Sequence, residues 1–318
     1  MSGQVRDAYD VVVIGGGAAG LNGALQLARS RRSVLVVDAG QPRNRPAAAV
    51  HGLLGHDGVP PARLLARGRD EVRGYGGEVV PGEVAAVGGD LAAGFTVTLG
   101  DGRVVLARRL LVTSGLVDNL PDIPGRGERW GRDVVPCPYC HGWEVRDQPI
   151  GVLASGPTSV HQALLFRQLS DDVVYFRRGT ALDGAAASRL AARGIRVVEG
   201  EVTAVVITDD RVAGVRLADG TVVARRALAV AARMTARAGF LADLGLKSSE
   251  HPSGMGTHVP ADPAGRTEVP GVWAAGNVTD LSAQVGAAAA AGALAGAVIN
   301  ADLVEEETSR AVEAAPVS

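Results

Sequence analysis

The chain has 318 residues, of which 47% are hydrophobic and only 3% aromatic, so about two domains with a sizeable core are expected. Its net charge of -2 and pI of about 6.3 offer no basic footprint for nucleic-acid binding. The first apolar run, 11–14, lacks the pattern of a signal peptide, and the apolar run at 286–299 is too short to span a bilayer. We therefore expect a soluble, cytoplasmic protein with neither nucleic-acid nor membrane partners.

The N-terminal segment 9–14 is short, apolar and β-branched, which is typical of a buried strand. Gly15-Gly16-Gly17-Ala18-Ala19-Gly20 follows at once and leads into a helical stretch that ends near Arg29. In this context the G-x-G-x-x-G pattern predicts a dinucleotide site, where glycines let the pyrophosphate approach the helix N-terminus. A second strand, 33–37, ends in Asp38, at the spacing of a carboxylate that bonds a ribose hydroxyl.

Residues 41–61 read as a loop that holds His51, His56 and Asp57, and 63–73 read as a helix. Either histidine could line a cofactor pocket or lie solvated in the loop. From residue 84 the pattern changes to short strands, with a hairpin turn at Asp101-Gly102. The same pattern returns around Asp219-Gly220, and we interpret this as an internal repeat of a whole domain. Two similar nucleotide-binding modules are thus predicted, one inserted in the other.

The second module begins with the strand 150–153 and the turn 154–159, which reads A-x-G-x-x-S. Only Gly156 of the three glycines survives, since the tight-turn position holds an alanine and the packing position a serine. The next strand, 173–176, ends in Arg177-Arg178, which could accept the 2′-phosphate of NADPH or form a solvated basic edge. The sequence leaves NADPH binding at Gly156, Arg177 and Arg178 open.

Cys137 and Cys140 are the only cysteines and lie two residues apart, in Cys-Pro-Tyr-Cys-His-Gly-Trp. Such a pair in an intracellular protein indicates redox or metal chemistry rather than a structural staple. Zinc requires about four ligands, and the pair with His141 supplies three, so we predict a redox pair and no metal. His141 is the candidate base, because thiolates are the nucleophiles and imidazole exchanges protons near neutral pH; the alternative is a histidine that only packs the turn.

The C-terminal segment 269–277 reads as a short strand running into Gly276-Asn277, followed by an Ala-rich helix from about Gln284. Amides at the start of this helix could face acceptor oxygens of a ligand, or the helix could be only a buried packing element. Residues 305–307 and the tail after them are expected to be solvated or disordered.

In motif order, the chain resembles the low-molecular-weight thioredoxin reductase family along almost its whole length. The resemblance rests on the Gly15–Gly20 turn, Thr113-Ser114-Gly115, the Cys137–Cys140 pair before the second turn, and 271–277. It implies an α/β fold of two Rossmann-like three-layer domains, the second inserted in the first, in a homodimer. FAD would be bound by 1–117 plus 246–318, and 118–245 would form an NADPH-domain-like module that carries the cysteines.

The resemblance also implies the residues of the site. The catalytic group is Cys137 as the exchanging thiol, Cys140 facing the flavin, and His141. The FAD contacts are Gly15, Gly17, Ala18, Ala19, Gly20, Asp38, Ala39, His51, Val84, Ser114, Gly115, Gly276, Asn277, Gln284 and Val285.

Three features depart from the reductase pattern. His141 replaces the usual Asp after the second cysteine, Asn277 replaces the usual Asp of the flavin motif, and the second nucleotide turn is degraded. Together they resemble the dithiol oxidases of natural-product pathways, such as those that close the disulfides of holomycin and gliotoxin. We therefore predict an oxidase that uses FAD and oxygen to form a disulfide in a small-molecule dithiol, with hydrogen peroxide as product.

Two alternatives stay open. The first is an NADPH-dependent disulfide reductase with a thioredoxin-like protein as partner, which Arg177 and Arg178 favour and the degraded turn opposes. The second is a flavin-binding scaffold without turnover, which the intact cysteine pair opposes.

Overall fold

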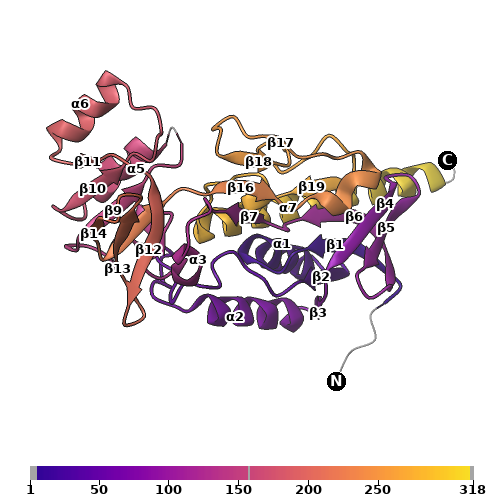
Figure 1. Cartoon of the computed structure of the whole chain (residues 1–318). Helices are drawn as coiled ribbons and strands as arrows, with labels where there is room; N and C mark the ends of the chain where they lie inside the picture. Colours follow the sequence, from indigo (N-terminus) through magenta and orange to yellow (C-terminus); the bar gives the residue numbers. More distant parts are fainter. Residues whose placement is uncertain (1–5, 157, 316–318) are drawn as a thin grey trace. The chain divides into compact units, whose positions relative to one another are not determined.

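The computed structural model describes residues 6–156 and 158–315, and it divides the chain into two compact units. Unit 1 comprises 1–43, 62–117 and 234–318, and unit 2 comprises 44–61 and 118–233. Within the described residues each unit contains parallel strands covered by helices, so the predicted pair of Rossmann-like domains, one inserted in the other, is confirmed (Figure 1).

Unit 1 is built on a seven-stranded sheet of order β3-β2-β1-β6-β5-β4, in which β19 also pairs with β6. Its strands are β1 (Ala8–Ile14), β2 (Val34–Asp38), β3 (Glu78–Pro81), β4 (Val84–Asp90), β5 (Gly94–Leu99), β6 (Val104–Val112) and β19 (Val272–Ala274). The helices are α1 (Ala18–Arg29), α2 (Pro61–Gly74) and α7 (Val285–Ala314), with the short turns η1 (Gly239–Leu244) and η2 (Gly276–Val278). Parallel pairing of β1 with β2 and β6 brings the ends of β1 and β2 together, where the predicted phosphate turn begins.

Unit 2 repeats the plan with a five-stranded parallel sheet of order β11-β10-β9-β15-β8. Its elements are α3 (Arg126–Arg129), β8 (Val134–Val135), α4 (Pro138–His141), β9 (Ile150–Leu153), α5 (Ser159–Phe166), β10 (Val173–Phe176), α6 (Gly184–Ala192), β11 (Arg196–Val198), β12 (Val202–Thr208), β13 (Arg211–Leu217), β14 (Val222–Ala224) and β15 (Ala227–Val230). The repeat predicted from the two Asp-Gly turns is confirmed, since β5–β6 and β13–β14 are both antiparallel hairpins. In unit 1 one continuous strand, β6, serves both the hairpin and the parallel sheet, whereas in unit 2 these roles fall to β14 and β15.

The chain passes between the units at β7 (Leu116–Asn119) and β16 (Arg233–Ala236), which join β17 (Ser249–Glu250) and β18 (Gly256–His258) in a sheet of order β17-β18-β16-β7. The compact units differ from the predicted boundaries at two segments. Residues 234–245 group with unit 1, where Ala236, Ala238 and Leu241 are buried in its core, and 44–61 group with unit 2. The assignment of FAD to the first unit and of an NADPH-like role to the second stays a prediction.

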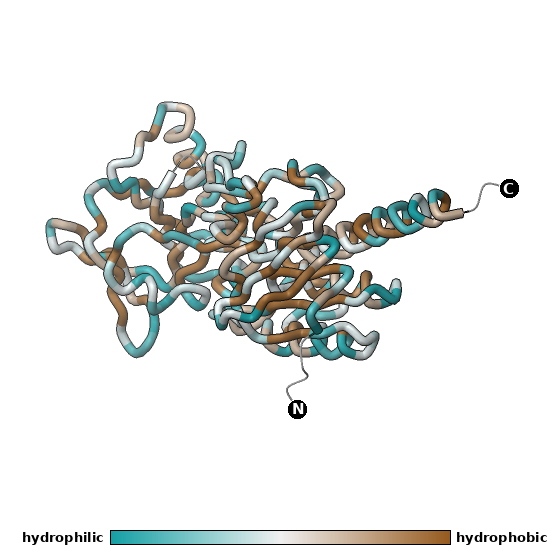
Figure 2. Tube along the Cα trace, turned by 90° about the vertical axis from the view of Figure 1, so that its right-hand side faces the viewer, coloured by the Kyte–Doolittle hydropathy of each residue, from teal (hydrophilic) through white to brown (hydrophobic). Residues whose placement is uncertain are grey.

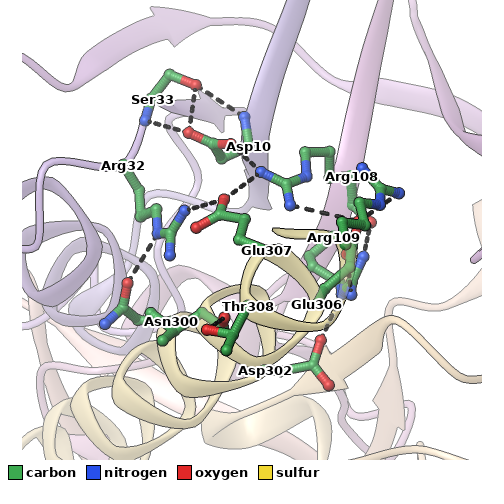
Figure 3. A network of polar contacts seen from close by, with 12 residues as sticks. Asp10, Arg32, Ser33, Arg108, Arg109, Asn300, Asp302, Glu306, Glu307 and Thr308 are labelled. Carbon is green, nitrogen blue, oxygen red and sulfur yellow. Dashed lines mark hydrogen bonds and ion pairs between the residues drawn. The ribbon is translucent and has the colours of Figure 1, made fainter. Parts of the chain in front are cut away.

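Of the two states expected for 305–307 and the tail, disorder is wrong for 305–314, because α7 runs without a break to Ala314. Nearly all of these residues are exposed, as a solvated segment would be, and 316–318 lie outside the described residues. Figure 3 shows why the last turns of α7 stay helical: their acidic side chains meet arginines of the sheet and of the α1–β2 connection. The ion pairs join Arg109 to Asp302 (2.6 Å) and Glu306 (2.5 Å), and join Glu307 to Arg32 (2.6 Å) and Arg108 (2.7 Å). These pairs lower the pKa of Glu307 to about 2, chiefly through its hydrogen bonds to the two arginines.

The apolar run at 286–299 forms only the first half of α7, which continues through residues of mixed polarity to Ala314. Among the described residues, this 30-residue helix is the one that is long and apolar enough to cross a membrane by length and composition. Its apolar part packs against α1, where Gly292 lies so close that an added Cβ would stand 1.9 Å from the Ala19 carbonyl oxygen. Figure 2 shows its last turns as a mixture of hydrophilic and hydrophobic residues. The helix is therefore a packing element of unit 1.

Candidate active site

The first predicted phosphate turn has the geometry that a dinucleotide requires. Gly15 has φ +114°, and an added Cβ would lie 2.4 Å from the Thr113 carbonyl oxygen. An added Cβ on Gly20 would lie 1.9 Å from the Gly15 carbonyl oxygen, so the third glycine packs the helix on the turn. Gly17 is the N-cap of α1, has open space at its Cβ position, and leaves the helix without a side-chain cap. The amides of the first helical turn are thus available to a phosphate.

The C-terminal motif converges on the same helix start. Gly276 has φ +80°, and an added Cβ would lie 2.8 Å from the Cβ of Ala19. Gln284 is the N-cap of α7 and Val285 its first residue, and this N-terminus has no side-chain cap either. Two uncapped helix N-termini therefore accompany the turn in unit 1, which is what an acceptor-rich cofactor such as FAD needs.

The remaining predicted FAD residues of unit 1 have various surroundings. The Asp38 carboxylate ends β2 beside Gly16, accepts from the Gly40 amide (2.8 Å), and pairs with Arg69 of α2 (3.3 Å). Ala39 follows it in an exposed position, and Val84 opens β4 opposite Leu99.

Ser114 donates its hydroxyl to the Arg237 carbonyl oxygen (2.6 Å), and Gly115, with φ +71°, accepts from the Arg237 amide. Arg69 was missed because an arginine on an amphipathic helix gives no signal of its target.

Asn277 explains one departure from the reductase pattern. Its side-chain amide donates two hydrogen bonds, to the carbonyl oxygens of Asp280 (3.0 Å) and Ala283 (2.9 Å). An ionised aspartate has no proton to donate to either carbonyl. The asparagine therefore holds the loop that leads into α7, and its carbonyl oxygen remains as an acceptor.

The redox pair lies on a short helical turn of unit 2. Cys137 is the N-cap of α4 and Cys140 its third residue, and the two Sγ atoms are 2.7 Å apart. Both side chains are partly buried. Gln162 of α5 donates to the Pro136 carbonyl oxygen (2.7 Å), and an added Cβ on Gly142 would lie 2.3 Å from Leu169. The turn is thus held at both of its ends by α5 and the segment that follows it.

His141 ends α4 beside this pair. Both of its ring nitrogens are buried and have no hydrogen-bond partner among the described residues. Burial lowers the pKa of His141 below 6.5; the carboxylate of Glu144 opposes this shift and the His51 ring adds to it. The imidazole is therefore neutral at neutral pH and has a lone pair ready for a proton.

His51 belongs to unit 2, whereas the phosphate turn that it was predicted to serve belongs to unit 1. Its Nδ1 is 3.5 Å from Asp57 and its Nε2 is 3.4 Å from Glu144. A flavin contact by His51 stays a prediction, and the structure adds Glu144 and Asp57 to its surroundings. The sequence could not reveal this group, because His51 and Glu144 are far apart along the chain. Within the described ranges, no cluster of three or more His, Cys, Asp or Glu side chains is arranged to hold a metal ion.

The second nucleotide turn is satisfied from within. The backbone amides of Ser155 and Gly156 both donate to the hydroxyl of Ser159, at 3.0 and 3.2 Å, and Ser159 is fully buried. Arg178 donates to the Ala154 carbonyl oxygen (3.0 Å), and burial lowers its pKa. Arg177 donates to the Thr180 carbonyl oxygen and pairs with Glu199 (3.1 Å). The groups predicted to meet NADPH thus all have protein partners.

The family model of the pyridine nucleotide-disulphide oxidoreductases matches residues 9–293. The chain belongs to this family. A thioredoxin reductase of Claviceps purpurea, tcpT, is 32% identical over 93% of this chain and 95% of its own. A probable thioredoxin reductase of Arthroderma benhamiae is 34% identical over 54% of this chain, but the match spans only 44% of that relative.

Among solved structures, that of HlmI is 48% identical, with a TM-score of 0.91 over 98% of this chain and 97% of that one. An oxidoreductase from Agrobacterium tumefaciens is 36% identical, with a TM-score of 0.88 over 93% of this chain and 99% of that one. The resemblance to thioredoxin reductases is confirmed, and the chain is a flavin-dependent thiol/disulfide oxidoreductase of that kind with FAD as cofactor.

Proposed function

We propose that the chain is a dithiol oxidase of a natural-product pathway, which closes a disulfide in a small-molecule dithiol and passes the electrons to oxygen. One observation carries the proposal: the Ser159 hydroxyl accepts from the Ser155 and Gly156 amides of the second nucleotide turn, while the cysteine pair is intact. A reductase needs an open NADPH site to supply electrons, and here the Ser155 and Gly156 amides, which would donate to a phosphate, already donate to the Ser159 hydroxyl.

In the proposed reaction, a substrate thiolate attacks Cys137 of the oxidised pair and Cys140 leaves as a thiolate. The second substrate thiolate then attacks the substrate sulfur of the mixed disulfide, so the product leaves as a disulfide and both cysteines are reduced. His141, neutral and next to Cys140, takes the substrate proton. Bound FAD would accept the electron pair of the reduced cysteines and hand it to oxygen, which yields one hydrogen peroxide per disulfide.

An NADPH-dependent disulfide reductase with a thioredoxin-like partner is the second candidate. It is favoured by the names of relatives such as the thioredoxin reductase tcpT, and by the position of Arg177 and Arg178 directly after β10. Both arginines would have to leave their present partners to hold a 2′-phosphate. For either activity we propose a cytoplasmic homodimer.

Anaerobic reduction of the purified FAD-bound protein separates the two candidates. Flavin absorbance is followed after adding either NADPH or a small dithiol, with the Cys137→Ser variant as the control for the dithiol. We expect the dithiol alone to bleach the wild-type flavin, oxygen to restore the colour with release of hydrogen peroxide, and the variant to stay yellow. Rapid bleaching by NADPH would overturn the oxidase and favour the reductase.

A further inference from the structure

Two exposed aromatic side chains stand on the redox turn. Tyr139 and Trp143 are 67% and 66% exposed, although the chain contains only 3 tryptophans and 4 tyrosines. Within 6–156 and 158–315, the other large exposed aromatic residue is Tyr75, whose ring and hydroxyl are both engaged by Arg29. Exposed apolar surface gathered at one place on a protein marks an interaction site.

The four-residue spacing of Tyr139 and Trp143 favours one face of the turn for both rings. Helical geometry continues from α4 into Gly142, which has φ -70° and ψ -33° and donates its amide to the Pro138 carbonyl oxygen (2.8 Å). Trp143 follows Tyr139 by four residues, and side chains at this spacing are neighbours on a helical surface. Cys140 lies between them in the sequence, so the aromatic surface borders the reacting thiols.

Trp143 is held in place before any ligand arrives. The Arg146 guanidinium lies over its ring, 4.1 Å from the centroid, and donates to the Trp143 carbonyl oxygen (2.7 Å). One face of the indole is therefore covered by a cation, and the exposed remainder is oriented. A ring fixed in this way loses little freedom on binding, which favours affinity.

We propose that Tyr139 and Trp143 form the substrate-binding surface, and that the dithiol taken there carries a flat, unsaturated ring. This rests on the proposed oxidase function. The sulfur that attacks Cys137 has to reach the turn, and a flat ring attached to it can stack on a neighbouring aromatic side chain. Aromatic pairs in offset or edge-to-face contact gain about 0.5–1.5 kcal/mol beyond their buried area.

The size of the surface favours a small molecule over a protein. Aromatic side chains bury roughly 150–250 Å² each, whereas a stable protein interface requires about 800 Å² from each partner. Two rings on one turn offer an area of the first size, which is below what a protein interface requires. The area therefore favours a small planar dithiol over a protein thiol as the ligand.

Two synthetic dithiols test this directly. Benzene-1,2-dimethanethiol and butane-1,4-dithiol both close to six-membered cyclic disulfides, so they differ mainly in the flat ring. kcat/KM is measured by oxygen consumption for the FAD-bound wild type, Tyr139→Ala, Trp143→Ala and Trp143→Phe, with Tyr75→Ala as the remote aromatic control. We expect the wild type to prefer the aromatic dithiol by about tenfold, near the upper end of the stacking range.

The expected pattern in the variants is selective. Trp143→Ala and Tyr139→Ala should each lose about tenfold with the aromatic dithiol and little with butane-1,4-dithiol, Trp143→Phe should recover part of the loss, and Tyr75→Ala should match the wild type. Equal wild-type rates for the two dithiols, or equal losses with both in the variants, would overturn the aromatic surface and leave the oxidase standing. Wild-type protein that consumes oxygen with neither dithiol, while NADPH reduces its flavin, would instead overturn the oxidase itself. Oxidation of a reduced thioredoxin-like protein that depends on Trp143, without oxidation of either dithiol, would replace the small molecule by a protein.

Discussion

Replacing His141 by Asn should abolish most turnover and leave the fold intact. General acid–base catalysis contributes about 10²- to 10⁴-fold, so we expect kcat/KM for a small dithiol to fall by that factor. Stability should change little, because both ring nitrogens of His141 are buried without a hydrogen-bond partner among the described residues and no stabilising bond is lost. If His141 only packed the turn, its replacement would lower stability and leave kcat/KM nearly unchanged.

The pH dependence follows from the direction of the shift. Burial holds the pKa of His141 below 6.5, so the base stays neutral as the pH falls through 6.5 and kcat/KM should begin to drop only below that value. The folded protein binds this proton less readily than the unfolded chain, so protonation in acid also destabilises the fold. Glu144 raises the pKa of His141, so Glu144→Gln should move the acid limb of the profile to still lower pH.

The assay is oxygen consumption by the FAD-bound protein with butane-1,4-dithiol from pH 5 to 8, with thermal unfolding followed in parallel. His161→Asn is the matched control, because His161 is an exposed histidine on α5 of the same unit. Turnover within threefold of wild type in His141→Asn, or an unchanged acid limb, would refute the role of His141 as base.

Three further changes test the surroundings of the site. Asn277→Asp removes two donated hydrogen bonds and places a charge beside carbonyl oxygens, so we expect a loss of about 2 kcal/mol in stability and weaker FAD retention, measured by flavin release on heating; retention equal to wild type would contradict this. Gly142→Ala puts a methyl group 2.3 Å from Leu169, so overpacking should cost about 1–3 kcal/mol and disturb the redox turn, measured by urea unfolding and by the rate of thiol alkylation. Glu307→Gln removes the stabilisation that the lowered pKa of Glu307 provides. This stabilisation is fully present above the pKa of the unfolded chain, near 4.5, and is lost as the pH falls towards about 2. Wild type should therefore be more stable than the variant by under about 1 kcal/mol at pH 7, and the difference should vanish near pH 2.

Local sequence determined the parts of this protein whose chemistry lies within a few residues. The glycines of the first turn, the strand before them and Asp38 after them could be placed because a φ of +114° and a backbone approach of 2.4 Å tolerate little else than glycine. The redox pair could also be predicted from the sequence, because a spacing of two residues is enough to bring the two sulfurs together. Hydropathy and the two Asp-Gly hairpins predicted the repeated module.

Tertiary structure decided what depends on partners distant in sequence. The acidic run at 305–307 looks like a solvated tail until the sheet brings Arg32, Arg108 and Arg109 to it. His51 reads as a loop histidine until folding sets it between Asp57 and Glu144. Ser159 reads as a lost glycine, yet its hydroxyl closes the second turn, because hydrogen-bond satisfaction is a property of three-dimensional neighbours rather than of residue order.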